Sequence, residues 1–197
     1  MSGSFPTTPK FRAINFQDNR PVLVNQTLSG KKSARQIGGQ YFSFTVQMPA
    51  MAQENGQKIF AFLQKQKGAF ENFTIQYPLT NLGSDKAQTD IASVGVQAAQ
   101  DATIAMDGFT ASTAGVLKAG DMIKFANHTK VYMVQDDVTS NGSGAATVSL
   151  VAALADNEAV TVNQPSLTVY LSSGEVMYST DPSGFFSIAF DVRELIA

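Results

Sequence analysis

The chain has 197 residues, enough for one large domain or two small ones, and 44% of them are hydrophobic, which is ample for a core. The net charge of −2 argues against a nucleic-acid binder that works by bulk electrostatics. The sequence contains no cysteine, which excludes disulfides and thiolate chemistry.

Charged residues make up only 15% of the chain, against about 25% in an ordinary globular protein. Serine, threonine, asparagine and glutamine supply the missing polarity. Such an uncharged surface suits a protein that is covered by neighbours, because charged residues are depleted at the centres of interfaces. An ordinary β-protein with a polar exterior is the alternative.

No apolar run approaches the roughly 20 residues that a membrane-spanning helix needs. The polar, Pro/Thr-rich residues 1–9 are unlike a signal peptide, so we expect a protein made in the cytoplasm without Sec export of its own.

In chain order, residues 1–10 are predicted to be a flexible arm, followed by a loose apolar cluster of Phe11, Ile14 and Phe16. The segment 18–21 has the composition of a turn, and 22–28 that of a strand.

Residues 29–39 are predicted to be a loop or hairpin end between Gly30 and Gly39. They contain three cations within five positions: Lys31, Lys32 and Arg35. This cluster is a candidate subunit or partner contact, and a solvated loop is the alternative.

Residues 41–78 predict a strand, a helix and a second strand. Apolar and polar residues alternate over 42–48, as in a half-buried strand, until Pro49 ends the pattern. The apolar period then becomes helical, which predicts a helix over 53–67. Alternation resumes over 73–77.

Residues 85–164 contain several short strands separated by turns, of which the clearest is a hairpin over 121–134. This texture favours a small β-barrel or sandwich. The last strand, 186–190, alternates like 42–48, and we expect the two to pair. We therefore predict a mainly β protein with an outer domain of residues 1–84 plus 165–197.

In this arrangement residues 85–164 are an inserted β module. The alternative is two consecutive domains, with the last strand belonging to the second.

No catalytic constellation is apparent. The single histidine, His128, lies at a predicted hairpin tip without a nucleophile motif nearby. Asp136, Asp137 and Asn141 lack the spacing of an EF-hand and are interpreted as turn residues. We expect no enzyme activity, no catalytic residues, no metal and no cofactor.

Several stretches resemble the N-terminal part of bacteriophage tail proteins: 28–30, Arg35, 41–46, 60–63 and 68–73. These are the distal-tail and tail-tube-like proteins, in which a helix lies across strands and the subunits assemble into rings. A second set is similar to a small β-module that recurs in phage structural proteins: 117–121, 130–132 and 142–147.

The resemblance implies a structural protein of the virion tail, in the distal tail, baseplate or tail hub, with a strand–helix–strand tail-tube-like domain. The implied partners are further copies in a homo-oligomeric, hexameric ring and other tail proteins of the tube, hub or fibre. DNA can pass through such a ring without sequence-specific binding, and no membrane is involved. The alternative is a monomeric β-rich binding module, for example for carbohydrate, which the absence of tryptophan weakens.

Overall fold

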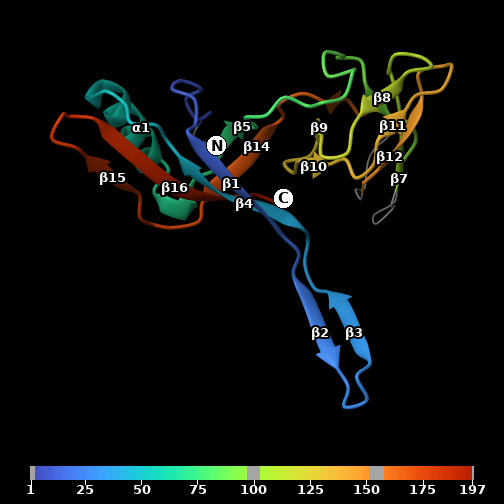
Figure 1. The fold of residues 1–197 in the computed structure, drawn as a ribbon, viewed down its shortest axis with the longest axis horizontal. Helices are drawn as coiled ribbons and strands as arrows, with labels where there is room; N and C mark the ends of the chain where they lie inside the picture. Colours follow the sequence, from blue (N-terminus) through green and yellow to red (C-terminus); the bar gives the residue numbers. More distant parts are fainter. Residues whose placement is uncertain (1–2, 97–102, 151–157, 197) are drawn as a thin grey trace. The chain divides into compact units, whose positions relative to one another are not determined.

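The structure is a computed structural model that describes residues 3–96, 103–150 and 158–196. It is mainly β, with 41% strand and 9% helix, as the sequence predicts. The chain divides into two compact units, the first comprising Met1–Ile75 with Thr168–Ile196 and the second Gln76–Leu167 (Figure 1). That residues 85–164 fold independently of residues 1–84 plus 165–197 stays a prediction.

The first unit is built on a six-stranded sheet. Its strand order is β1 (Ala13–Asn19), β4 (Tyr41–Gln47), β16 (Phe186–Glu194), β14 (Ser166–Leu171) and β5 (Phe73–Gln76), with β15 (Met177–Thr180) pairing to the start of β16. The predicted pairing of the last strand with residues 42–48 is confirmed, because Phe190 lies opposite Val46 in an antiparallel ladder. Ile14 and Phe16 were expected in a loose cluster, but they lie in β1 opposite Val46 and Phe44.

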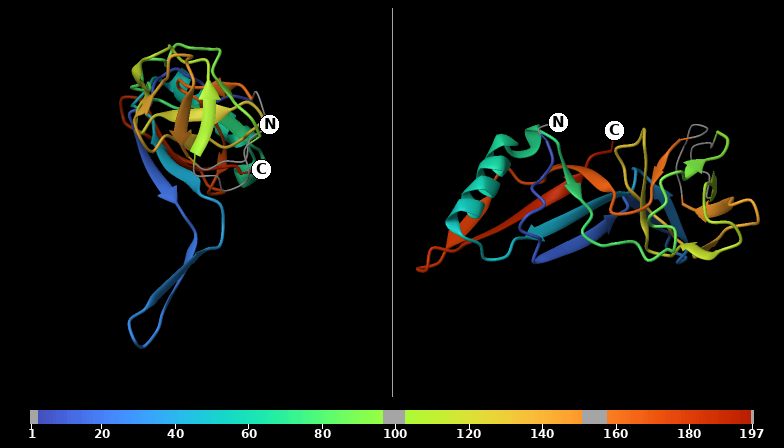
Figure 2. Two further views of the ribbon diagram at one scale, coloured as in Figure 1. Left: turned by 90° about the vertical axis from the view of Figure 1, so that its right-hand side faces the viewer. Right: turned by 90° about the horizontal axis from the view of Figure 1, so that it is seen from above.

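The apolar face of this sheet lies under one helix, α1 (Gln53–Lys65), which Figure 2 shows along one side of the strands. Every second residue of β4 is buried, as the alternation predicts. Ile59 and Leu63 of the helix are buried against this face. The predicted helix is confirmed and ends at Lys65, because Lys67 adopts a left-handed backbone (φ 54°) before the 3₁₀ turn Gly68–Phe70.

The N-terminal segment was predicted to be flexible, and for residues 3–5 that prediction is wrong. The Phe5 N–H donates to the Thr74 carbonyl at 2.7 Å, and the Thr74 N–H donates to the Gly3 carbonyl at 3.0 Å. The Phe5 side chain is 4% exposed and packs on four other rings: Phe11, Phe62, Phe73 and Phe190. One aromatic anchor therefore fixes a segment whose polar composition suggested an arm.

The second unit consists of short strands in three small sheets. These are β12 (Ala146–Ser149), β7 (Thr103–Asp107) and β6 (Ala92–Ser93); β11 (Val138–Thr139) and β8 (Ala114–Leu117); and β10 (Tyr132–Met133), β9 (Met122–Phe125) and β13 (Val160–Thr161). The predicted hairpin over 121–134 is confirmed, with Tyr132 opposite Ile123. Among the described strands no barrel closes, because the ladders are too short to join the sheets edge to edge. A shared apolar cluster, including Ile104, Val116 and Phe125, holds the three sheets together.

Polar side chains hold residues 81–83, near the start of the second unit, against residues 118–122. The Asp121 carboxylate accepts the backbone N–H groups of Leu82, Gly83 and Lys118 at 2.7, 3.0 and 2.9 Å. The Asn81 side chain exchanges hydrogen bonds with the backbone of Met122. These bonds satisfy buried groups that would otherwise be costly.

Tyr77 lies near this carboxylate. Its burial, and then the negative charge of Asp121, raise the pKa of the Tyr77 hydroxyl above its ordinary value.

Candidate assembly surface

The most exposed regular element of the first unit is a two-stranded hairpin, β2 (Val22–Gln26) and β3 (Lys32–Gln36). We call residues 21–40 the arm. Its antiparallel register runs from Val22 opposite Gln36 to Gln26 opposite Lys32, and all ten strand residues are exposed. The expected strand over 22–28 ends at Gln26, and the expected loop over 29–39 contains β3, because Thr27 and Lys31 already close the turn through backbone and hydroxyl hydrogen bonds.

The arm continues from the ends of β1 and β4 (Figures 1 and 2). The turn predicted at 18–21 is therefore wrong, since Asp18 and Asn19 are the last residues of a strand that runs on into the arm. Between the two ladders, Arg20 and Pro21 lie opposite residues 37–40. This local mismatch is a bulge, a feature that bends and twists a β-ribbon.

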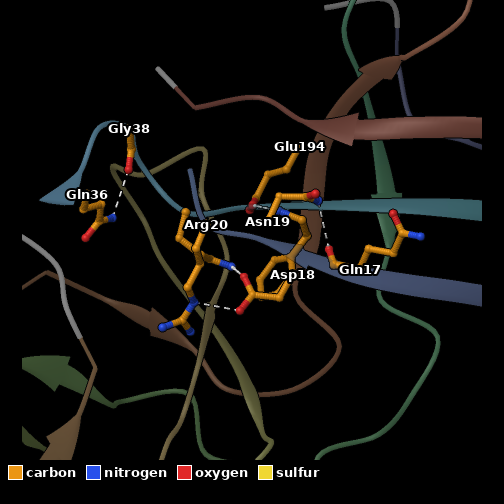
Figure 3. Close-up of polar contacts among 9 residues, drawn as sticks. Gln17, Asp18, Asn19, Arg20, Gln36, Gly38 and Glu194 are labelled. Carbon is orange, nitrogen blue, oxygen red and sulfur yellow. Dashed lines mark hydrogen bonds and ion pairs between the residues drawn. The ribbon is translucent and has the colours of Figure 1, made fainter. Parts of the chain in front are cut away.

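Polar contacts hold the base of the arm (Figure 3). The Arg20 guanidinium donates to Asp18 at 2.8 Å, and the Gln40 amide donates to the other oxygen of the same carboxylate at 2.6 Å. The Ile37 N–H donates to the Pro21 carbonyl at 3.0 Å, and the Gln36 amide donates to the Gly38 carbonyl at 2.9 Å. The arm is thus attached to the sheet on both strands.

Apolar residues occur on both faces of the arm. Val22 and Val24 (46% and 51% exposed) share one face, Leu23 (51%) lies on the other, and Leu28 (111%) projects from the tip. An isolated two-stranded hairpin is at best marginally stable in water. Exposed apolar side chains on both faces make the arm a candidate contact surface.

The three cations predicted as a contact all lie on the arm, but the structure does not gather them into one patch. Lys31 lies at the turn, Lys32 opposite Gln26 and Arg35 opposite Leu23, so Lys32 and Arg35 point to opposite faces of the ladder. In the part of the chain that the structure describes, none of the three forms an ion pair. There is no acidic residue between Pro21 and Gln40.

Sequence reasoning missed a second exposed surface, the hairpin of β15 and β16. Met177, Tyr178 and Phe185 are 77%, 49% and 46% exposed. Within the described residues β15 pairs with β16 alone, so its other edge is open. The signal available in the sequence was the apolar pair Met177–Tyr178 beside a Pro-Ser-Gly turn, which by itself predicts only a strand.

The face of the sheet away from α1 is polar and shallowly hollowed. A groove of about 420 Å³ is lined by residues that include Gln17, Tyr41, Ser43, Thr45 and Asp191. Two aromatic residues line it, and neither presents a free ring: the Arg193 guanidinium lies 3.8 Å from the centre of the Tyr41 ring, and Phe44 is buried. This groove therefore has no free aromatic ring on which a sugar could stack.

The remaining sequence candidates lie in the second unit as structural residues. His128 Nδ1 and the Tyr132 hydroxyl are 2.7 Å apart. Asn141 Oδ1 accepts the N–H groups of Ser143 and Ala145 and so acts as a turn residue, whereas Asp137 accepts the Ala119 N–H at 3.0 Å and joins two loops that are distant in the sequence. Over the described ranges, no group of three or more His, Asp or Glu side chains is placed to hold a metal ion.

Comparison with known proteins gives matches to phage distal tail proteins. Residues 83–166, which lie within the second unit, match the family described as "Distal tail protein pb9, B domain". Distal tail protein pb9 of Escherichia phage T5 is 23% identical over 124 residues, which are 63% of this chain. The chain resembles phage distal tail proteins.

The match covers 60% of the length of the T5 protein. The resemblance to phage tail proteins predicted from the sequence is thus confirmed, and it supports a structural role in a phage tail and a location in the virion tail. No described helix is long and apolar enough to cross a membrane.

Proposed function

We propose that this protein assembles into a homo-oligomeric, hexameric ring that forms part of the distal tail or baseplate hub. Its function is mechanical: the ring joins neighbouring tail proteins of the tube, hub or fibre. It acts without catalysis and without a cofactor.

The observation that carries this proposal is the exposed arm together with the open strand edges of the first unit. The arm has apolar residues on both faces, and β1 and β15 each present an edge that pairs on one side only within the described residues. Backbone pairing between such edges joins subunits without needing many charges. A different edge on each side of the sheet favours head-to-tail contact, which closes into a ring when the rotation allows.

The polar face of the sheet suits the wall of a channel. Its side chains are largely amides and hydroxyls, and the two opposite charges among the groove residues, Asp191 and Arg193, are held by Thr45 and Tyr41. A wall without a surplus of cations would not retain the phosphates of passing DNA, since phosphate binding depends on Lys and Arg contacts. The second unit would then contact another tail protein.

Light scattering coupled to size-exclusion chromatography tests the proposal. A ring gives a mass that is a fixed multiple of 21.0 kDa, six-fold for a hexamer, and negative-stain images show an annulus with a central hole. A 21.0 kDa species at every protein concentration would instead favour the monomeric binding module.

A further inference from the structure

The sequence contains the dipeptide Asn-Gly twice, at Asn55–Gly56 and at Asn141–Gly142. In this dipeptide the backbone nitrogen of the glycine can attack the side-chain amide carbon of the asparagine, because glycine has no Cβ to block the approach. The product is a cyclic succinimide, which water opens to aspartate or isoaspartate. The structure distinguishes the two asparagines, and the difference predicts which of them reacts.

Asn141 lies in an exposed turn whose hydrogen bonds favour this attack. Its Oδ1 accepts the Ser143 N–H at 2.9 Å, the Ala145 N–H at 3.0 Å and the Ser143 hydroxyl at 2.8 Å. The bond from the Ser143 N–H folds the amide back over its own backbone, toward the Gly142 nitrogen. Three donors around one carbonyl oxygen also stabilise the negative charge that this oxygen gains during the attack, as in an oxyanion hole.

The nucleophile and the leaving group at this turn are both unengaged. Within the described residues, neither the Gly142 N–H nor the Asn141 Nδ2 donates a hydrogen bond. Residues 141–143 are exposed, so water and hydroxide reach the reacting atoms. No hydrogen bond of the nitrogen or of the leaving amide therefore has to break before the succinimide closes.

Asn55–Gly56 serves as an internal reference, because α1 protects it. The Gly56 N–H donates to the Ala52 carbonyl at 3.1 Å, so the attacking nitrogen is already used by the helix. Gly56 is buried against Phe186, where an added Cβ would lie 2.5 Å from the Phe186 Cβ. Closing a succinimide here would break a helical hydrogen bond and displace a tightly packed glycine.

We propose that Asn141 is a site of spontaneous deamidation and that Asn55 is protected from it. The Gly142 nitrogen loses its proton to hydroxide and bonds to Asn141 Cγ; the Cγ–Nδ2 bond breaks, and Nδ2 takes up a proton from water and leaves as ammonia. One water molecule then opens the imide on either side. The net change is asparagine plus water to aspartate or isoaspartate plus ammonia, without an oxidant or a cofactor. This inference does not depend on the proposed ring.

Both products change the turn. Each adds one negative charge, and in isoaspartate the chain runs through the side chain, so that the α-carbonyl of residue 141 becomes a free carboxylate. That carbonyl accepts the Ser112 N–H at 2.8 Å and the Gly144 N–H at 3.1 Å, and isoaspartate therefore weakens the contact between residues 109–113 and 140–145. A protein of the virion tail is not renewed after assembly, so the change would accumulate as the particle ages.

Peptide mapping during incubation at mildly alkaline pH tests the proposal. Cleavage before aspartate releases residues 137–155, and cleavage after lysine and arginine releases residues 36–58, so mass spectrometry follows both asparagines in one sample. A new cut before residue 141 marks aspartate, whereas isoaspartate leaves that peptide whole. We expect Asn141 to convert at least about ten-fold faster than Asn55, because only its turn holds the reacting atoms together. Equal rates at the two sites in the folded protein overturn the proposal.

The same measurement in urea is the control for the fold. Unfolding removes the structural difference between the two dipeptides, so their rates should converge. An Asn141 rate that is lower in the folded protein than in urea would show that the turn protects this residue, and would refute the proposal.

Two substitutions separate the nucleophile from the oxyanion donors. Gly142 is outside the left-handed region, and a Cβ there meets its nearest atom, Ser112 Oγ, at 3.9 Å, so Gly142→Ala fits the turn. It should slow the conversion about ten-fold by crowding the nitrogen. Ser143→Ala removes the hydroxyl donor alone and should slow the conversion several-fold. With folding verified by circular dichroism, a rate that neither substitution changes would refute the proposed chemistry.

Discussion

The two units of this protein differ in how they use polar and apolar residues. Of the nine buried polar or charged residues in the described chain, six lie in the second unit: Asn81, Asp85, Ser93, Asp121, Ser140 and Glu158. The exposed large apolar residues show the opposite bias, since ten of fifteen belong to the first unit. The first unit thus leaves apolar surface uncovered, and the second buries more polar side chains, of which Asn81 and Asp121 are hydrogen-bonded.

Charge divides in the same way. The first unit has ten lysines and arginines against seven carboxylates, a net charge of +3, and the second has four against nine, a net charge of −5. The small net charge of the whole chain is therefore the sum of a basic first unit and an acidic second unit. This difference fits the proposed function, in which the first unit would form the subunit contacts, and the prediction that the second folds by itself.

The strongest test of this comparison is to remove the second unit. A variant in which Leu82 joins Ser166 should fold and assemble, because the strands on either side of the deletion, β5 and β14, are neighbours in the sheet of the first unit. Circular dichroism and light scattering measure the outcome. A wholly unfolded product would show that the two units depend on one core.

Loss of one buried carboxylate should unfold the second unit selectively. Asp121→Ala leaves three backbone N–H donors without their acceptor, at about 1–3 kcal/mol for the buried Gly83 and about 1 kcal/mol for each of the two part-buried bonds. We expect a loss of unfolding free energy of at least about 3 kcal/mol, seen as an early transition in urea or heat. The control is Asp137→Ala, an exposed residue with one such bond, for which the expected loss is about 1 kcal/mol. Equal effects would contradict the network.

The first unit should be most sensitive to its apolar anchor. Phe5→Ala removes a ring that is 4% exposed among four aromatic neighbours, and large-to-small changes of this kind cost about 3–5 kcal/mol. Thermal unfolding of the deletion variant, with and without this change, measures the loss in the first unit alone. The exposed Phe70 (77%) is the control, since Phe70→Ala should change stability by less than about 0.5 kcal/mol. A loss from Phe5→Ala no larger than that from Phe70→Ala would return residues 3–5 to a flexible arm.

The smallest effect on stability, and a large one on association, is expected for the arm. Replacement of Lys31, Lys32 and Arg35 together by serine alters only exposed side chains, so stability should stay within about ±0.5 kcal/mol. Sedimentation should show weaker association than in the wild type. Apart from the contribution of these three cations, which salt should screen, the proposed ring should depend only weakly on salt, because apolar contact and strand pairing are not screened. Unchanged association in the triple variant would make this segment an ordinary solvated hairpin.

Local pattern in the sequence determined the elements with strong periodicity. The alternation of residues 42–48 predicted β4, the helical spacing after Gln53 predicted α1, and the matching texture of 186–190 predicted the strand that pairs with β4. Period and turn chemistry act within a few residues, so they can be read without the fold. The family resemblance also followed from such local stretches.

Only the tertiary structure decided what each exposed or buried residue does. Phe5 lies in a polar segment and becomes an anchor because four distant rings surround it. Residues 32–36 have too little apolar alternation to predict a strand and form one because β2 provides the backbone partners. The separation of the arm from β15 at opposite ends of β4 depends on register between strands more than 100 residues apart, which no local pattern encodes.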